Sequence, residues 1–374
     1  MTIDRRTMLA SAAGIAATSL LPTAARAAAA PDGRKWVIVN ALGGLADPNI
    51  QDAPDPFSPR VLAEAHASGI TAINCTLGYV AGPAEPFEKS VADVAEMDML
   101  LRRYPRDLLK ILSAADIRRA KAEKKIGLIY GFQNGAMMGK DAARVDIFAN
   151  MGVRIFQITY NPANQLGDGS MAPGNRGLTP FGREVIERLN AQKMIVDLSH
   201  SGEQTCLEAA RVSKAPISIN HTGCRAVTDL PRNKTDAELR LVAEKGGFIG
   251  IYFMPFLNIS GHARAEDVVH HIDHAVNICG EDHVGIGTDG HIGQIDDLRA
   301  YEAVLAKEIA ERRAAGISAA GERPDTYPFV VDLRGPDQFR KLISLLAARG
   351  YSSRRIEKIM GLNFLRHAES VWGG

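Results

Sequence analysis

Eight short runs of β-branched and other apolar residues constrain this fold more than any other feature of the chain. Each run is nearly continuous in its apolar character, which is typical of parallel strands buried on both faces. The stretches between them, such as FGREVIERLNAQ and AEDVVHHIDHAVNICG, place apolar residues at helical intervals. The runs are WVIVNAL from residue 36, ITAINCTL from 70, IGLIYGF from 126, VRIFQITY from 153, MIVDLSH from 194, PISINH from 216, GFIGIYFM from 247 and HVGIGTDG from 283.

This alternation predicts the architecture of the chain. A strand followed by a helix and a further parallel strand forms a βαβ unit, and repeated units build a parallel sheet covered by helices. Eight units predict an α/β fold in which the sheet closes into a (β/α)8 TIM barrel. An open, doubly wound sheet is the alternative, and the lack of a G-x-G-x-x-G turn after the first run disfavours it.

The first 30 residues differ from the rest of the chain. They contain a twin arginine at Arg5 and Arg6, a short apolar stretch and an Ala-x-Ala region near Ala27. This pattern predicts a twin-arginine export signal, so that the mature protein is periplasmic or secreted. The apolar stretch is too short and too rich in alanine, glycine and serine for a stable membrane span. Residues 31–374 are therefore expected to form one barrel domain.

Charge and cysteine content exclude some classes of partner and site. Cleavage near Ala27 would remove three arginines and one aspartate, which changes 44 basic and 43 acidic residues to 41 and 42. A balance so close to neutral predicts neither a nucleic-acid nor an anionic membrane partner. No two of the four cysteines are spaced as C-x-x-C, so a thiolate zinc site is not expected. Buried free thiols are the simplest interpretation, although an oxidising compartment permits disulfides.

Polar side chains stand at the ends of the predicted strands. In a (β/α)8 barrel the carboxyl ends of all strands meet at one mouth, where the functional residues of such proteins lie. One strand-end histidine is usually structural, whereas two histidines and an aspartate from three strands predict a site. The polar residues at the strand ends are Asn40, Thr76, Gln133, Asn134, Tyr160, Asn161, His200, His221, Tyr252, Asp289 and His291.

Two long insertions follow the first and the eighth predicted strands. Residues 43–60 are rich in glycine, proline and aspartate, and residues 291–336 include a further helical stretch, DDLRAYEAVLAKEIAERRAAG. Both insertions would lie over the mouth of the barrel. Long loops at this position commonly form the walls or the lid of a substrate pocket.

Four blocks of the sequence point to a known family: VDLSHSG, INHTGCRAVTDLPRNKTD, HHIDHAVNICGEDHVGIGTDG and GYSSRRIEKIMGLNFLRHAESVW. With these blocks in this order, the chain resembles the membrane (renal-type) dipeptidases over most of its predicted mature length. The resemblance implies a barrel of the metal-dependent hydrolase type that holds two zinc ions, cleaves dipeptides and often forms homodimers. Two such ions lower the pKa of a bound water and polarise the scissile carbonyl.

Several functional residues of the family have matches in this chain. His200 and His221 match the metal ligands on two of the later strands. Arg232, in LPRNKTD, matches an arginine that binds the substrate carboxylate, for which a two-pronged guanidinium is well suited. Asp289, in GIGTDG, matches the aspartate that takes and returns the proton.

Other positions depart from the family pattern. Leu42 and Gly44 stand where the first strand would supply a histidine and an aspartate to the metals, and neither can bind one. Gln133 replaces the glutamate that bridges the two ions, and its neutral amide supplies no charge. Tyr160 stands where the family has an oxyanion-stabilising histidine, and His291 is added two residues after the acid–base aspartate. A two-zinc site is therefore not expected.

These matches and departures leave three hypotheses. The first is a divergent enzyme that acts on a small molecule or short peptide with a carboxylate, through one divalent metal, with zinc as the expected ion. The second is a metal-free binding protein that uses the same pocket, in which Leu42 fills the place of a ligand. The third is an ordinary zinc dipeptidase whose ligands lie elsewhere, although neither His66 nor His262 belongs to a His-x-Asp pair.

The first hypothesis gives each candidate residue a role. His200 and His221 would hold the metal, and because two neutral imidazoles bind zinc weakly, Asp289 or His291 would have to supply a third ligand. Tyr160 would donate a hydrogen bond to a developing oxyanion. The predicted catalytic residues are Asp289, Tyr160 and His291, and the predicted substrate contacts are Arg232, Gln133 and Asn161.

Overall fold

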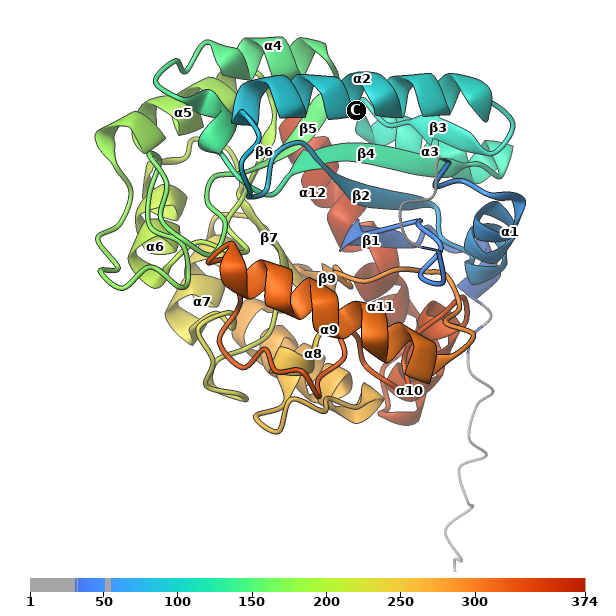
Figure 1. The fold of residues 1–374 in the computed structure, drawn as a ribbon. Helices are drawn as coiled ribbons and strands as arrows, with labels where there is room; N and C mark the ends of the chain where they lie inside the picture. Colours follow the sequence, from blue (N-terminus) through green and yellow to red (C-terminus); the bar gives the residue numbers. More distant parts are fainter. Residues whose placement is uncertain (1–30, 32, 51–54, 374) are drawn as a thin grey trace, which may run out of the picture.

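Eight strands of the chain follow one another around a ring (Figure 1). The computed structural model describes residues 31, 33–50 and 55–373, and the predicted export signal lies outside them. Every pairing around the ring is parallel, as buried apolar runs joined by helices require. The strands of the ring, in spatial order, are β1 (Val39–Gly43), β2 (Ala72–Leu77), β4 (Ile126–Phe132), β5 (Val153–Gln157), β6 (Ile195–Asp197), β7 (Ser218–Thr222), β8 (Phe248–Ile251) and β9 (Val284–Ile286).

Hydrogen bonds between β1 and the segment after β9 complete the ring. The backbone N–H of Asp289 donates to the carbonyl of Leu42 at 2.9 Å. The side chain of Asn40 donates to the hydroxyl of Thr288 and accepts from its backbone N–H, both at 2.8 Å. The first and last strands of the ring are therefore neighbours. The (β/α)8 prediction is confirmed, and the open, doubly wound alternative is wrong.

Helices connect the strands and cover the outside of the barrel. Several begin as local sequence predicts: the Thr179 hydroxyl accepts from the backbone N–H of Gly182 at 2.9 Å, with Pro180 in the first turn. The helices are α1 (Pro59–Ser68), α2 (Pro86–Arg103), α3 (Ala114–Glu123), α4 (Arg144–Asn150), α5 (Pro180–Ala191), α6 (Glu203–Val212), α7 (Asp236–Glu244), α8 (Ala265–Cys279), α9 (Leu298–Ala314), α10 (Gln338–Ala348), α11 (Ser353–Glu357) and α12 (Asn363–Trp372). Short 3₁₀ turns span Gly33–Lys35, Ala136–Met138 and Pro255–Leu257, and a π turn spans Lys358–Leu362.

The last helix, α12, closes one end of the barrel. It passes behind the ring of strands in Figure 1 and packs its apolar face into the barrel core. The ring of Phe364 meets that of Phe248 on β8 edge to face, with centroids 5.3 Å apart. Because this end is filled, the opposite end, formed by the carboxyl ends of the strands, is the one left to bind a ligand.

One strand and the cysteines complete the description of the fold. The short strand β3 (Leu108–Lys110) pairs with β4 outside the ring and was not predicted. Cys75, Cys206, Cys224 and Cys279 are buried and unpaired, which confirms the interpretation of them as free thiols. No helix in the described part of the chain is long and apolar enough to cross a membrane.

Candidate functional site

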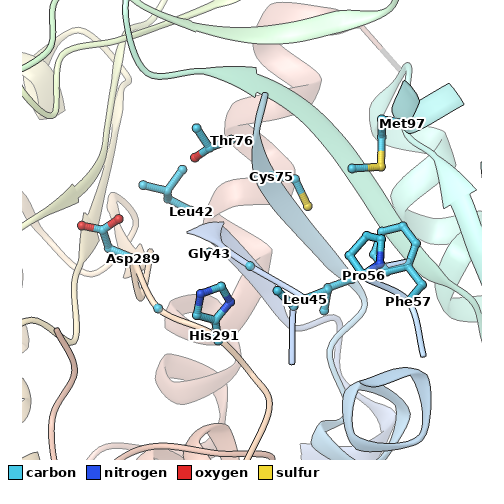
Figure 2. Close-up of a pocket in the computed structure, with 13 residues that line it drawn as sticks. Leu42, Gly43, Leu45, Pro56, Phe57, Cys75, Thr76, Met97, Asp289 and His291 are labelled. Atoms are coloured by element: carbon cyan, nitrogen blue, oxygen red, sulfur yellow. The ribbon is translucent and has the colours of Figure 1, made fainter. Parts of the chain in front are cut away.

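Two cavities meet at the mouth of the barrel and share the wall Asp289–Gly290–His291. The first, which we name the apolar chamber, encloses about 310 Å³. The second, which we name the insertion chamber, encloses about 280 Å³. Figure 2 shows Asp289 and His291 beside the end of β1, with Phe57 and Met97 across the apolar chamber. The apolar chamber is defined by Leu42, Leu45, Phe57, Cys75, Thr76 and Met97, and the insertion chamber by Ile50, Tyr301, Glu308, Arg312, Phe329 and Arg334.

Asp289 lies where the two chambers meet. Its backbone is in the left-handed region, with φ of +57°, which is costly for a residue other than glycine and is frequent at functional sites. Burial raises the pKa of its carboxyl group to about 6, although the positive charges of Arg232 and Arg312 oppose that rise. A carboxyl group with this pKa exchanges its proton near neutrality, as a general acid or base must.

His200 is buried, with 3% of its surface exposed; it lines neither chamber, and both of its ring nitrogens have partners. Nδ1 lies 2.6 Å from Oδ1 of Asn161, and Nε2 lies 3.3 Å from Nη2 of Arg232. Because the guanidinium can only donate, Nε2 is the acceptor and Nδ1 carries the proton. Burial, together with the charge of Arg232, lowers the pKa of His200 well below its usual range. The imidazole is therefore neutral and held on both sides.

Arg232 is also buried, with 2% of its surface exposed, and it lines neither chamber. Its Nη1 donates to the carbonyl oxygen of Ser199 at 2.6 Å, and its Nη2 donates to His200. The guanidinium carbon lies 5.8 Å from the ring centroid of Tyr252. Arg232, which was predicted to bind a substrate carboxylate, therefore donates its hydrogen bonds to Ser199 and His200 in this structure.

His221 differs from His200 in having no hydrogen-bond partner. It is fully buried, its ring centroid lies 4.9 Å from that of His200, and neither ring nitrogen is bonded within the described structure. Burial lowers the pKa of His221 well below its usual range, so the ring is neutral. Buried imidazole nitrogens are ordinarily hydrogen-bonded. The two ring nitrogens of His221 are therefore either available to a ligand or a cost to the stability of the fold.

Three further predicted site residues are Tyr160 and Asn161, which contact His200, and Gln133, which follows β4. The ring of Tyr160 stacks on His200 with centroids 4.2 Å apart. Asn161 is buried and uses its amide on both sides, accepting from His200 and donating to the carbonyl of Ile317 at 2.8 Å. Gln133 donates to the hydroxyl of Thr76 at 2.7 Å. Asn161 therefore positions His200, and Thr76 links Gln133 to the apolar chamber.

His291 and Gly44 are complementary in space. A Cβ atom added at Gly44 would lie 2.7 Å from Nδ1 of His291, so the imidazole takes the space that a side chain there would need. The backbone of the two residues also forms a parallel bridge. The imidazole of His291 and the missing side chain of Gly44 are therefore mutually dependent at the wall shared by the chambers.

The donors present do not fit the two-metal centre that the resemblance implies. Leu42 and Gly44 offer no ligand atom, and Nε2 of His200 already accepts from Arg232. No group of three or more histidine, cysteine, aspartate or glutamate side chains in the described ranges is placed to hold a metal ion. The prediction of a single metal on His200 and His221 stays a prediction.

The spare histidines do not replace the missing ligands. His66, on α1, lies 3.1 Å from a carboxylate oxygen of Asp107, and His262 lies 3.5 Å from one of Asp325. Both histidines are exposed, and neither lines a chamber. The hypothesis of a zinc dipeptidase with ligands elsewhere therefore gains no support from these two residues.

The sequence profile of the membrane dipeptidase family (Peptidase family M19) matches residues 84–320. The chain belongs to this family of hydrolases. The predicted resemblance is confirmed.

Among curated relatives, an uncharacterized protein in the pqqA 5′ region of Klebsiella pneumoniae is 28% identical over 301 residues, which cover 78% of this chain and 98% of that protein. The dipeptidase tcpJ of Claviceps purpurea is 29% identical over 267 residues, 69% of this chain. The match spans 54% of that fungal dipeptidase. These relatives agree with the family assignment and leave the substrate open.

Solved structures agree with the fold. An amidohydrolase from Pseudomonas aeruginosa is 29% identical, with a TM-score of 0.78 over 91% of this chain and 98% of its own. A metallo peptidase from Rhodobacter sphaeroides, liganded with a phosphinate mimic of the dipeptide L-Ala-D-Ala, is 20% identical. Its TM-score is 0.72 over 90% of this chain and 99% of its own. Because the Rhodobacter sphaeroides protein is only 20% identical, its similarity to this chain concerns the fold alone.

Proposed function

We propose that this chain hydrolyses a small, peptide-like substrate that carries a carboxylate and lies across the mouth of the barrel. The position of Asp289 carries the proposal. This carboxyl group lies on the wall shared by two chambers, and its pKa is raised to about 6. A short peptide with one end in each chamber would place its central bond at this group.

The protein groups around the reacting bond have distinct tasks. As a carboxylate, Asp289 takes a proton from the attacking water, and as an acid it returns one to the leaving amine. Burial, with the charge of Asp289, raises the pKa of Tyr160 to about 12, so its hydroxyl keeps its proton at neutral pH. Tyr160 lines neither chamber in this structure, and its proposed hydrogen bond to an oxyanion depends on its proximity to Asp289. Arg232 adds a buried positive charge that lowers the pKa of Asp289 and so opposes the effect of burial.

The proposal routes no step through a metal ion, and it leads to a prediction about metal content. We expect no more than one metal ion per chain, because the first strand and Gln133 supply no charged ligand and His200 is engaged by Arg232. Elemental mass spectrometry of protein purified after export without added metal measures this number. The His200→Ala variant is the control for a specific site. A measured content of two ions per chain would contradict this prediction and indicate an ordinary two-metal dipeptidase centre.

The pH dependence of hydrolysis tests the role of Asp289. The carboxylate is the form that accepts a proton, and its pKa is about 6. We therefore expect kcat/KM to fall as the pH drops through about 6 and to level off above it. The experiment incubates the protein with a mixture of dipeptides that includes C-terminal D-residues, and quantifies released amino acids by mass spectrometry from pH 4.5 to 8. Failure to cleave any of them, or a flat profile between pH 5 and 7, would contradict the proposal.

A binding protein without turnover is the second candidate. Leu42 supports it, because an apolar side chain lines the apolar chamber at the position where the family pattern has a metal ligand. Under this alternative, the same peptides would bind and be released unchanged. The mass-spectrometric assay separates the two, since only hydrolysis produces free amino acids.

A further inference from the structure

The insertion chamber contains a cation that no carboxylate neutralises in the described structure. Nε of Arg334 donates to the carbonyl oxygen of Val331 at 3.1 Å. Its Nη1 is buried and has no hydrogen-bond partner among the described residues. The guanidinium carbon lies 5.5 Å from the ring centroid of Phe329, which also lines the chamber. A buried N–H group without an acceptor is costly, so this arrangement favours an anionic ligand.

The other arginine of the insertion chamber is already neutralised. Nε and Nη2 of Arg312 both lie 2.6 Å from one carboxylate oxygen of Glu322. Its Nη1 lies 3.7 Å from a carboxylate oxygen of Glu308. The chamber also contains Asp47, whose carboxylate accepts hydrogen bonds from its own loop. Asp289 and Glu308 also line the chamber, so three carboxyl groups face two guanidinium groups there. Among the described residues, Arg334 is the guanidinium of this chamber that forms no ion pair with a carboxylate.

An aromatic shelf lies beside this cation. The ring centroids of Phe329 and Tyr301 are 5.6 Å apart, and Phe329 stacks on Tyr327 with centroids 5.1 Å apart. Phe329 and Tyr301 line the insertion chamber together with Arg334. An apolar side chain adjacent to a carboxylate could lie on these rings while the carboxylate meets the guanidinium.

We propose that Arg334, Phe329 and Tyr301 form a subsite for an anionic residue with a large apolar side chain, such as the C-terminal residue of a short peptide. The rest of the ligand would extend past Asp289 into the apolar chamber. The direction of this peptide relative to Asp289 rests on the proposed hydrolytic function, whereas recognition of the carboxylate does not. In this proposal the carboxylate of the ligand binds to Arg334, and not to the buried Arg232.

Matched probes without a peptide bond test the subsite separately from catalysis. The probes are 3-phenylpropionate and 3-phenylpropionamide, which have the same size and shape but end in a carboxylate and a neutral carboxamide. Calorimetry gives the dissociation constant of each. We expect wild-type protein to prefer the acid by about tenfold or more, and Arg334→Gln to lose that preference. Arg334→Lys should keep part of it. Arg354→Gln, at an exposed arginine that lines neither chamber, is the control and should keep all of it. Thermal melting of each variant checks folding.

The outcomes distinguish this inference from the proposed function. Absence of a preference for the acid in wild-type protein, or its survival in Arg334→Gln, would overturn the subsite. Loss of the preference in Arg232→Gln, with no loss in Arg334→Gln, would overturn it as well. A preference that depends on Arg334, in a protein that cleaves no peptide, would support the subsite and remove the hydrolytic function. If the protein cleaves peptides but its preference for the acid does not depend on Arg334, the hydrolytic function is supported and the subsite is overturned.

Discussion

Replacement of Asp289 by asparagine is expected to lower kcat for peptide hydrolysis by about 10²- to 10⁴-fold, the usual contribution of a positioned general acid–base group. Asparagine keeps the shape of the side chain and tolerates the left-handed backbone with φ of +57°. The backbone bond to Leu42 is unaffected, so the loss would come from the carboxyl group itself. Steady-state kinetics on the peptide found in the screen measures it. Asp229→Asn, at a side chain that is 90% exposed, is the control.

The same substitution has an opposite expected effect on stability. The pKa of Asp289 is raised to about 6 from 3.8 by burial, so the folded state holds the proton more tightly than the unfolded state. The wild-type protein therefore loses stability as the pH rises through about 4 to 6. Asparagine cannot ionise, so the variant should be more stable than wild type at pH 8, by ~1–2 kcal/mol, and equal to it near pH 4. Urea unfolding at both pH values tests this. A variant that is less stable at pH 8 would show that the carboxylate is stabilised by a partner.

The barrel could be predicted because its strands are buried on both faces. Runs such as IGLIYGF and GFIGIYFM contain no polar position, and their repetition eight times leaves few other folds. Leu108–Lys110 escaped prediction for a physical reason. Three residues are too few for a periodic signal, and this strand pairs only with β4, outside the ring.

The site could be predicted only in part. The predicted topology places His200, His221 and Asp289 at one end of the barrel, and the rings of His200 and His221 lie 4.9 Å apart in the structure. The depth of Arg232 and its bond to His200 depend on side-chain packing, which strand positions do not specify. Arg334 was missed because it lies in the irregular part of the insertion, where no periodicity shows which side chains face the mouth. A single arginine within the stretch DLRGP matches no motif that would indicate a binding role.

The buried histidines His200 and His221 should respond differently to replacement by leucine. His200→Leu would leave Nη2 of Arg232 buried without a partner and Oδ1 of Asn161 with only the 3.3 Å bond from the Ser170 hydroxyl. We expect a loss of about 2–4 kcal/mol in the free energy of unfolding. His221→Leu removes two ring nitrogens that have no partner, so we expect a change within about 1 kcal/mol of wild type. Urea unfolding measures both. His270→Leu, at a half-exposed side chain, is the control.

Chelation turns this comparison into a test of what the two histidines hold. If their role is to ligate a metal, both substitutions should cost stability alike when metal is present, and the chelator should lower wild type to the level of the variants. If His200 is instead held by Asn161 and Arg232, its substitution should cost the same with and without chelator, and wild type should not change. We expect the second result, because the guanidinium of Arg232 donates to the nitrogen of His200 that a metal would need. An equal loss for His200→Leu and His221→Leu that disappears with chelator would show that the pair retains a metal site.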